Sequence, residues 1–158
     1  ELQERPQLRP IEIRHGSLGN RRDLRLSPQH AVALQTPEGI KLARATHLAQ
    51  RGTGRFRVAR GVKSVSYHHL LLPRHALLLA EGAVVESMWP GPIAIAAIGI
   101  ENRDDILRRA PHLKSALDGD VPVERLYGPR TAPMLRGREV KAMARIETPA
   151  AQALVAIA

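Results

Sequence analysis

Short alternating stretches separated by turn-forming residues are the feature that most constrains the fold of this chain. An Ile-Glu-Ile run at residues 11–13 and a Leu-Arg-Leu run at 24–26 alternate apolar with polar side chains, as half-buried strands do. Gly16, Gly19 and Asn20 lie between the two runs and favour turns. The spacing therefore predicts two short strands joined by a turn.

The same pattern continues up to residue 91. Its clearest case is Glu81-Gly82, a two-residue hairpin turn between apolar stretches. Strands of this length at this spacing predict an all-β core. The further elements expected are a strand over 31–34, a strand running into one helical turn over 40–48, a long extended segment over 62–72, and the hairpin arms 76–80 and 83–85.

Helical patterns replace the strands after residue 91. Asn102 is suited to cap a helix, because the turn that follows it is acidic and favourable against the helix dipole. A second amphipathic helix is predicted over 134–146. We therefore predict a mainly β domain over residues 8–91, followed by a short helical carboxy-terminal appendage, residues 92–158, packed on it.

Composition excludes several classes of site. The chain has 158 residues and no cysteine, which excludes disulfides, thiolate metal sites and a thiol nucleophile supplied by this chain. Cysteine usage therefore gives no information on whether the protein works in an oxidising or a reducing compartment. The longest apolar run, 92–100, is about half the length that a membrane-spanning helix needs. We expect no membrane span.

The positive charge is unevenly placed. The net charge is +9, and the densest basic stretch contains no acidic residue. One interpretation is a phosphate-binding loop, and the other is a solvated loop, which charge pattern alone favours. Single-stranded nucleic-acid binders usually add stacking aromatic residues to a basic groove, and few are present here, so we do not expect a nucleic-acid partner. The stretch consists of Arg51, Arg55, Arg57, Arg60 and Lys63.

His30 is the first candidate for acid–base chemistry. Ser27 lies three residues before it across a proline, so a tight turn could bring both side chains toward one point. Such a histidine could donate a proton to a leaving nitrogen while the hydroxyl fixes its orientation. The alternative is a turn histidine with Ser27 capping the local backbone, and composition alone favours it.

Three further histidines lie on or beside a predicted strand at 67–72. His68 and His69 would point to opposite faces of that strand, so one of them at most joins a given site. Together with His75 and His30 it could form a three-histidine metal centre. No neighbouring acidic ligand or i,i+4 histidine pair supports this, so we expect no metal and no cofactor. No Gly-x-Ser-x-Gly motif supports a serine hydrolase.

Three stretches, taken together, resemble the bacterial group of Hint domains, the hedgehog and intein type of autoprocessing domain. Residues 26–32 (LSPQHAV) resemble the family's Thr-x-x-His block, with Ser27 in the threonine position. Residues 67–87 (YHHLLLPRHALLLAEGAVVES) resemble its two closing blocks, and residues 127–139 are similar to the tail that follows the domain in that group.

The resemblance implies a mainly β, horseshoe-like Hint fold and self-cleavage by an N-to-S or N-to-O acyl shift. The substrate would be the flanking polypeptide fused in cis. By family match, His30 would protonate the departing amide nitrogen with Ser27 supporting it. His69 falls near a position where inteins often have an aspartate and would be a second acid or base, and His75 matches the histidine that follows.

Two departures from the family pattern bear on activity. The chain has no cysteine, and the family's opening segment with its nucleophile is expected before Glu1. Inteins end in His-Asn, whereas Val85-Glu86-Ser87 occurs here, so splicing is not expected. We expect an autoprocessing domain that is inactive in this chain. The alternative is a catalytically silent β-rich structural or protein-interaction domain.

Overall fold

The computed structural model describes residues 2 and 4–150, which fall into two compact units. The first comprises the described residues within 1–68, 77–86 and 132–158, and the second comprises 69–76 and 87–131. Both units are therefore discontinuous in sequence. The predicted division into 8–91 and 92–158 stays a prediction.

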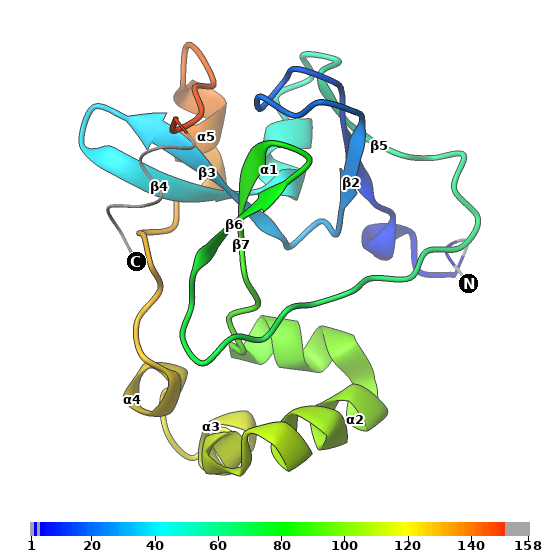
Figure 1. Cartoon of the computed structure of the whole chain (residues 1–158). Coiled ribbons are helices and arrows are strands. Elements are labelled where there is room, and N and C mark those ends of the chain that lie inside the picture. Colours follow the sequence, from blue (N-terminus) through cyan, green and yellow to red (C-terminus); the bar gives the residue numbers. More distant parts are fainter. Residues whose placement is uncertain (1, 3, 151–158) are drawn as a thin grey trace. The chain divides into compact units, whose positions relative to one another are not determined.

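The first unit contains a three-stranded antiparallel sheet in the order β2-β1-β5 (Figure 1). In the central strand, Glu12 lies opposite Arg25 on one side and opposite Arg57 on the other. The apolar residues of the central strand lie on the opposite face and are fully buried. The strands are β1 (Ile11–Ile13), β2 (Leu24–Leu26) and β5 (Phe56–Val58).

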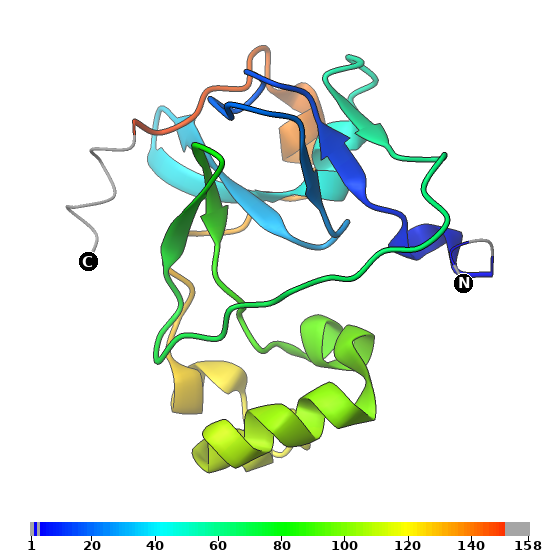
Figure 2. The ribbon, with the colours of Figure 1, turned by 45° about the vertical axis from the view of Figure 1, so that its right-hand side comes forward.

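A four-stranded antiparallel sheet in the order β4-β3-β7-β6 completes the strands of this unit (Figure 2). The two hairpins β3-β4 and β6-β7 meet where Val32 pairs with Val85. β4 runs directly into the short helix α1. The elements are β3 (Ala31–Thr36), β4 (Gly39–Arg44), α1 (Ala45–Ala49), β6 (Leu77–Ala80) and β7 (Ala83–Glu86).

The β6-β7 hairpin confirms the predicted turn. Glu81 and Gly82 have φ angles of 52° and 97°, the left-handed conformations that a two-residue type I′ turn needs at both positions. A Cβ at Gly82 would stand 2.9 Å from the carbonyl oxygen of Gly19. Glycine at this position is therefore required both by the backbone conformation and by the close approach of another turn.

A buried asparagine holds the turn between β1 and β2. Asn20 is 1% exposed, and its Oδ1 accepts the N–H of Leu18 at 3.0 Å. Its Nδ2 donates to the carbonyl oxygens of Ile13, Arg14 and Arg22 at 3.3, 3.1 and 2.6 Å. Burying an amide group costs free energy unless its donors and acceptor form hydrogen bonds. The side-chain amide of Asn20 forms them with backbone groups of the turn and of the strand β1 that leads into it.

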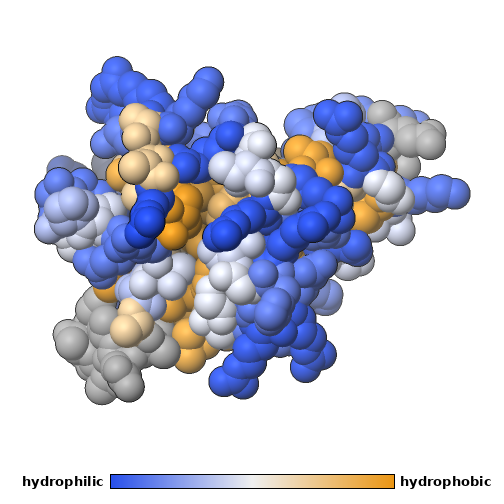
Figure 3. Space-filling view, turned by 90° about the horizontal axis from the view of Figure 1, so that it is seen from above, coloured by the Kyte–Doolittle hydropathy of each residue, from blue (hydrophilic) through white to orange (hydrophobic). Residues whose placement is uncertain are grey.

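The carboxy-terminal segment contributes to the same unit. Helix α5 (Gly137–Ala142) places the fully buried Val140 in the main apolar cluster. The guanidinium of Arg51 donates to the carbonyl oxygens of Val140 and Met143, at 2.6 and 2.7 Å, and so caps the end of α5. Hydrophilic side chains cover most of the face seen in Figure 3, with apolar atoms visible between them.

The second unit is helical. Its apolar cluster includes Met88, Ile106, Leu113 and Tyr127, with Trp89 packed against it. No helix in the described part of the chain has the length and apolar character needed to cross a membrane. The elements are α2 (Pro92–Arg109), a 3₁₀ turn η2 (Pro111–Leu113), α3 (Lys114–Leu117) and α4 (Val123–Tyr127); a further 3₁₀ turn, η1 (Pro6–Leu8), lies in the first unit.

The structure confirms the mainly β class with helices in the carboxy-terminal part, and it corrects three local predictions. Residues 62–72 form no strand. Asn102 does not begin a helix, because the helical part of α2 that contains Asp104 and Asp105 already starts directly after the break at Gly99, whose φ is 76°. The helix predicted over 134–146 is limited to α5, and the segment after it runs beside β3, where the N–H of Gln35 donates to the carbonyl of Glu147.

The hairpin turn gives a stability prediction. Gly82→Ala should lower the free energy of unfolding by about 1 to 3 kcal/mol, because the substituted residue keeps a left-handed φ and meets a carbonyl oxygen. Gly61→Ala is the matched control, since a Cβ there meets nothing within 4 Å and the position has no positive φ. Urea unfolding followed by circular dichroism measures both. Equal stability of the two variants would contradict this account of the turn.

Candidate functional site

The Ser27–His30 turn joins β2 to β3 and is held by backbone hydrogen bonds. The N–H of His30 is shared between the carbonyl oxygen of Ser27 at 3.1 Å and its Oγ at 3.2 Å. The beginning of α1 fastens the same turn, because Ala45 donates to the carbonyl of His30 at 2.9 Å and Thr46 donates to that of Pro28 at 3.0 Å. The backbone of His30 is thereby fixed from two sides.

Ser27 contacts His30 through the backbone. Its Oγ accepts a main-chain N–H three residues ahead, which is the local capping geometry of serine in turns. Such a bond stabilises the turn whether or not the histidine performs chemistry. A role for the hydroxyl in orienting the imidazole ring stays a prediction.

Glu86 fixes the other end of the turn. It is the last residue of β7 and is only 8% exposed, and its Oε1 accepts the N–H of Ala31 at 2.9 Å. Ala31 directly follows His30 and begins β3. Removing this acceptor would leave a buried N–H unpaired, which costs about 1 to 3 kcal/mol. A carboxylate in an otherwise apolar strand therefore holds the chain immediately after the candidate histidine.

His75 is buried and closely bound in the second unit. It is 6% exposed, and its Nδ1 accepts the backbone N–H of Thr131 at 2.9 Å. The Oγ1 of Thr131 donates to the carbonyl oxygen of His75 at 2.6 Å. Because a backbone N–H can only donate, Nδ1 carries a lone pair, and the proton of the neutral ring lies on Nε2. In the neutral ring of His75, Nε2–H is therefore the hydrogen-bond donor.

His69 is exposed on a segment without regular structure. The strand predicted at 67–72 is absent, and a bond from the N–H of Met88 to the carbonyl of Leu70, at 2.8 Å, connects this segment to the chain after β7. His68 beside it is also exposed. His68 and His69 therefore do not point to opposite faces of a strand, because no strand forms at these residues.

The four predicted site residues divide between the two units. Ser27 and His30 belong to the first unit, and His69 and His75 belong to the second. Within the first unit, the backbone N–H of His30 donates a hydrogen bond to the Oγ of Ser27. Among the residues that the structure describes, no group of three or more His, Asp or Glu side chains could hold a metal ion.

Two residues of these sites, Glu86 and Thr131, had no assigned role in the sequence. Each bonds to a residue 55 or 56 positions away, so no local spacing reveals the contact. A signal for Glu86 exists in retrospect, because a carboxylate ends the apolar run Ala83-Val84-Val85. Thr131 lies in the stretch that resembles the tail of the family, and nothing in that stretch indicates a histidine partner.

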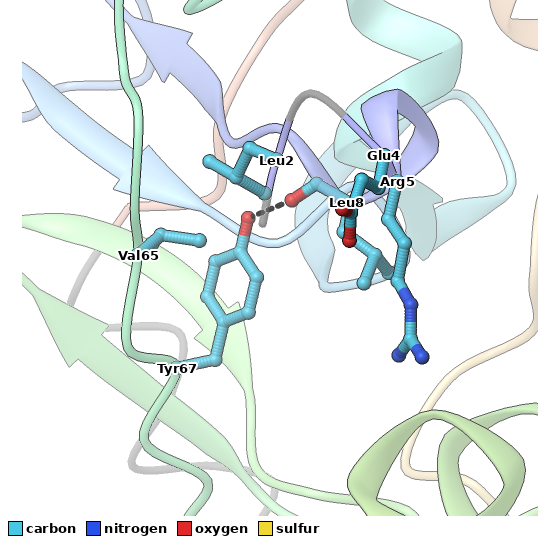
Figure 4. Close-up of a pocket in the computed structure, with 6 residues that line it drawn as sticks. All are labelled: Leu2, Glu4, Arg5, Leu8, Val65 and Tyr67. Carbon is cyan, nitrogen blue, oxygen red and sulfur yellow. Dashed lines mark hydrogen bonds between the residues drawn. The ribbon is translucent and has the colours of Figure 1, made fainter.

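A second feature of the first unit is a hollow beside η1 (Figure 4). It has a volume of about 360 Å³ and is lined by polar and apolar side chains. Tyr67 points across it, and its hydroxyl donates to the carbonyl oxygen of Leu8 at 2.6 Å. Burial raises the pKa of Tyr67 to about 12. The lining residues are Leu2, Glu4, Arg5, Leu8, Val65 and Tyr67.

Comparison with known proteins gives one match. The family model described as the Hint domain matches residues 1–92, which is more than half of the chain. No curated protein and no solved structure matches the chain. The matched range contains the Ser27–His30 turn, Glu86 and both histidines of the second unit that the sequence singled out.

The bonding of His75 predicts its tautomer. At a pH above the usual range of histidine titration, long-range ¹H–¹⁵N spectra should show the proton on Nε2, because Nδ1 accepts the N–H of Thr131. The exposed His68 is the control, and it should show a mixture of both tautomers. A proton found mainly on Nδ1 of His75 would contradict the assignment.

The chain has only two tyrosines, so their ionisation can be followed by ultraviolet absorbance. Tyr67 should ionise near pH 12, and Tyr67→Phe should remove that step. Since the folded-state pKa lies above the ordinary value of 10.0, the contribution of Tyr67 to stability is complete below pH 10 and is lost as the pH rises toward 12. Burial raises the pKa of Tyr127 too. A phenolate step near pH 10 in the folded chain would contradict the raised pKa of Tyr67.

Proposed function

We propose that this chain, which belongs to the Hint domain family, is a protein-autoprocessing domain whose self-cleavage chemistry is inactive in the chain as it stands. The reaction class is an N-to-S or N-to-O acyl shift on a peptide bond of the polypeptide fused to the domain. The observation that carries the proposal is the Hint domain match over residues 1–92, a range that contains the fixed Ser27–His30 turn, held by α1 on one side and by Glu86 on the other.

A general acid is effective only when it is held within reach of the atom that it protonates. His30 meets that requirement at the level of the backbone, because its N–H and C=O are both bonded and the residue after it is pinned by a buried carboxylate. In the acyl shift, the sulfur or oxygen of a thiol or hydroxyl gives up its proton and bonds to the preceding carbonyl carbon, and the C–N bond breaks to leave a thioester or ester. The departing amide nitrogen takes a proton, which we assign to the imidazole of His30.

His69 and His75 are assigned supporting roles. The family resemblance assigns His75 as a second donor toward the carbonyl oxygen, where negative charge develops during attack. The exposed ring of His69 is suited to exchange protons with solvent, as a second acid or base requires. Both assignments rest on the family resemblance and on the surroundings of each ring within the second unit.

The proposed inactivity follows from the absence of a thiol nucleophile in this chain. The chain supplies no thiol, so the N-to-S version of the reaction has no starting group here. Ser27 does not replace it, because an N-to-O shift at Ser27 would break the peptide bond to Leu26, the last residue of β2, and not the junction with a fused polypeptide. The absence of a thiol also favours the second candidate function, a catalytically silent scaffold that serves as a structural or protein-interaction domain.

The test uses the protein as its gene encodes it, with any residues before Glu1 included, beside the 158-residue chain. After incubation with dithiothreitol or hydroxylamine, mass spectrometry should find cleaved product from the encoded protein and none from the chain alone. His30→Ala should slow cleavage about a hundredfold or more, as expected when a general acid is removed. His68→Ala is the matched control, because it removes an exposed histidine outside the proposed set.

The outcomes separate the two candidate functions. An encoded protein that stays intact under both reagents would contradict autoprocessing and leave the silent scaffold. Cleavage of the 158-residue chain by itself would contradict the proposed inactivity. Cleavage that His30→Ala and His68→Ala slow equally would remove the assignment of His30.

A further inference from the structure

Three charged side chains lie side by side on one face of the first sheet. The register places Glu12 of the central strand directly opposite Arg25 and Arg57, so all three share a face. The carboxylate is 8% exposed, whereas the side chains of Arg25 and Arg57 are 57% and 53% exposed. A buried acid therefore lies between two half-exposed guanidiniums.

Each guanidinium binds one oxygen of that carboxylate. Arg25 donates through Nε and Nη2 to Oε2 at 3.4 and 3.2 Å. Arg57 donates through Nε, at 2.8 Å, and through Nη2 to Oε1. Hydrogen bonding from Arg57, opposed by burial and aided by Arg25, lowers the pKa of Glu12, so the carboxylate stays ionised at neutral pH. Glu12 thus fixes the direction of both guanidiniums.

Donors remain on both arginines. A guanidinium carries five N–H donors and is fully charged at neutral pH, and each one here directs a single edge toward Glu12. The other edge, with Nη1, has no bond in the described part of the chain. Two guanidiniums held in fixed directions with unused edges are the arrangement that binds oxyanions in a bidentate manner.

A broad hollow extends along this face of the unit. It has a volume of about 1090 Å³, and a third arginine, Arg60, lines it with no ion-pair partner among the described residues. Gly52 and Gly54 also line it, and a Cβ at either would meet nothing within 4 Å, so the backbone is open to a ligand. Three guanidiniums and one carboxylate leave two positive charges in the hollow.

A purely stabilising ion pair is the alternative, and the same chain contains an example of one. On α2, Asp105 binds Arg108 and Arg109, but this carboxylate is itself 46% exposed and the arginines are 72% and 76% exposed. These pairs join residues three and four apart on a helix surface, where they contribute a few tenths of a kcal/mol. The cluster around Glu12 differs by its buried acid, its cross-strand register and its hollow.

We propose that the Glu12-braced pair Arg25 and Arg57, with Arg60, forms a binding site for a ligand that carries two or more phosphate groups. Two excess positive charges favour a ligand with at least two negative charges, and two separate guanidiniums, each with an unused edge that can bind one phosphate in a bidentate manner, favour two phosphate groups. The basic stretch that the autoprocessing proposal does not use thereby acquires a role. The site is independent of that proposal, since it involves neither His30 nor a nucleophile.

The first experiment measures binding of inorganic tripolyphosphate to the full chain by isothermal titration calorimetry at low ionic strength. Arg57→Gln and Arg25→Gln should each weaken binding about tenfold or more, the loss of one charge-assisted bidentate contact. Arg108→Gln is the matched control, because it removes the same charge from an arginine that shares a carboxylate elsewhere. It should change binding by less than about twofold. Thermal unfolding confirms that each variant is folded.

A second variant distinguishes a braced site from general positive charge. Glu12→Gln removes a negative charge, so charge alone predicts tighter binding, whereas loss of the brace predicts weaker binding by a few-fold or more. Weaker binding supports the proposal and tighter binding overturns the role of Glu12. Absence of tripolyphosphate binding, or equal weakening by Arg57→Gln and Arg108→Gln, would overturn the site itself.

Discussion

The first unit depends on strand β3 being buried on both of its faces. Val32 and Leu34 point into the main apolar cluster, whereas Ala31 and Ala33 point into a second cluster. Small alanines on that second face allow the chain around Ala132 to approach closely. A strand buried on both faces cannot slip by one residue without moving every side chain to the wrong face. The position of His30, immediately before this strand, is therefore set by packing.

The covering of the second face explains why distant segments matter. The segment after Ala132 runs parallel to β4, where Leu42 exchanges hydrogen bonds at 2.8 Å with the carbonyl of Pro133 and the N–H of Leu135. It thereby occupies the outer edge of β4, which would otherwise be exposed. The chain then returns through α5 to bury Val140 in the main cluster. The end of the described chain is thus part of the β unit.

Local chemistry explains which elements the sequence could predict. The Glu81-Gly82 turn and the strands at 11–13 and 24–26 are encoded by residues within a few positions of each other. The strand predicted at 67–72 does not form, because the apolar residues 70–72 alone do not supply a neighbouring strand to pair with. β5 was missed because its three residues sit within a stretch that reads as basic loop. Its pairing with β1 spans 45 positions between Arg57 and Glu12.

The candidate site shows the same limit. The Ser27–His30 turn is local and could be predicted, whereas the bonds from Glu86 to Ala31 and from Thr131 to His75 depend on the tertiary fold. The basic stretch likewise separates into roles that charge alone does not reveal. Arg51 caps α5, and Arg57 pairs with Glu12. Net charge therefore could not decide between a phosphate-binding loop and a solvated one.

The bonds that hold the Ser27–His30 turn stabilise the fold and do not by themselves indicate catalysis. Every bond described for the turn engages the backbone of Pro28, His30 or Ala31, and the hydroxyl of Ser27 serves that backbone too. A silent scaffold needs the same bonds to fold, so Ser27, Glu86 and the turn itself fit both candidate functions equally. The imidazole ring of His30 takes no part in these backbone bonds. The distinction between an autoprocessing domain and a silent one therefore rests on the ring and on the nucleophile that it would serve.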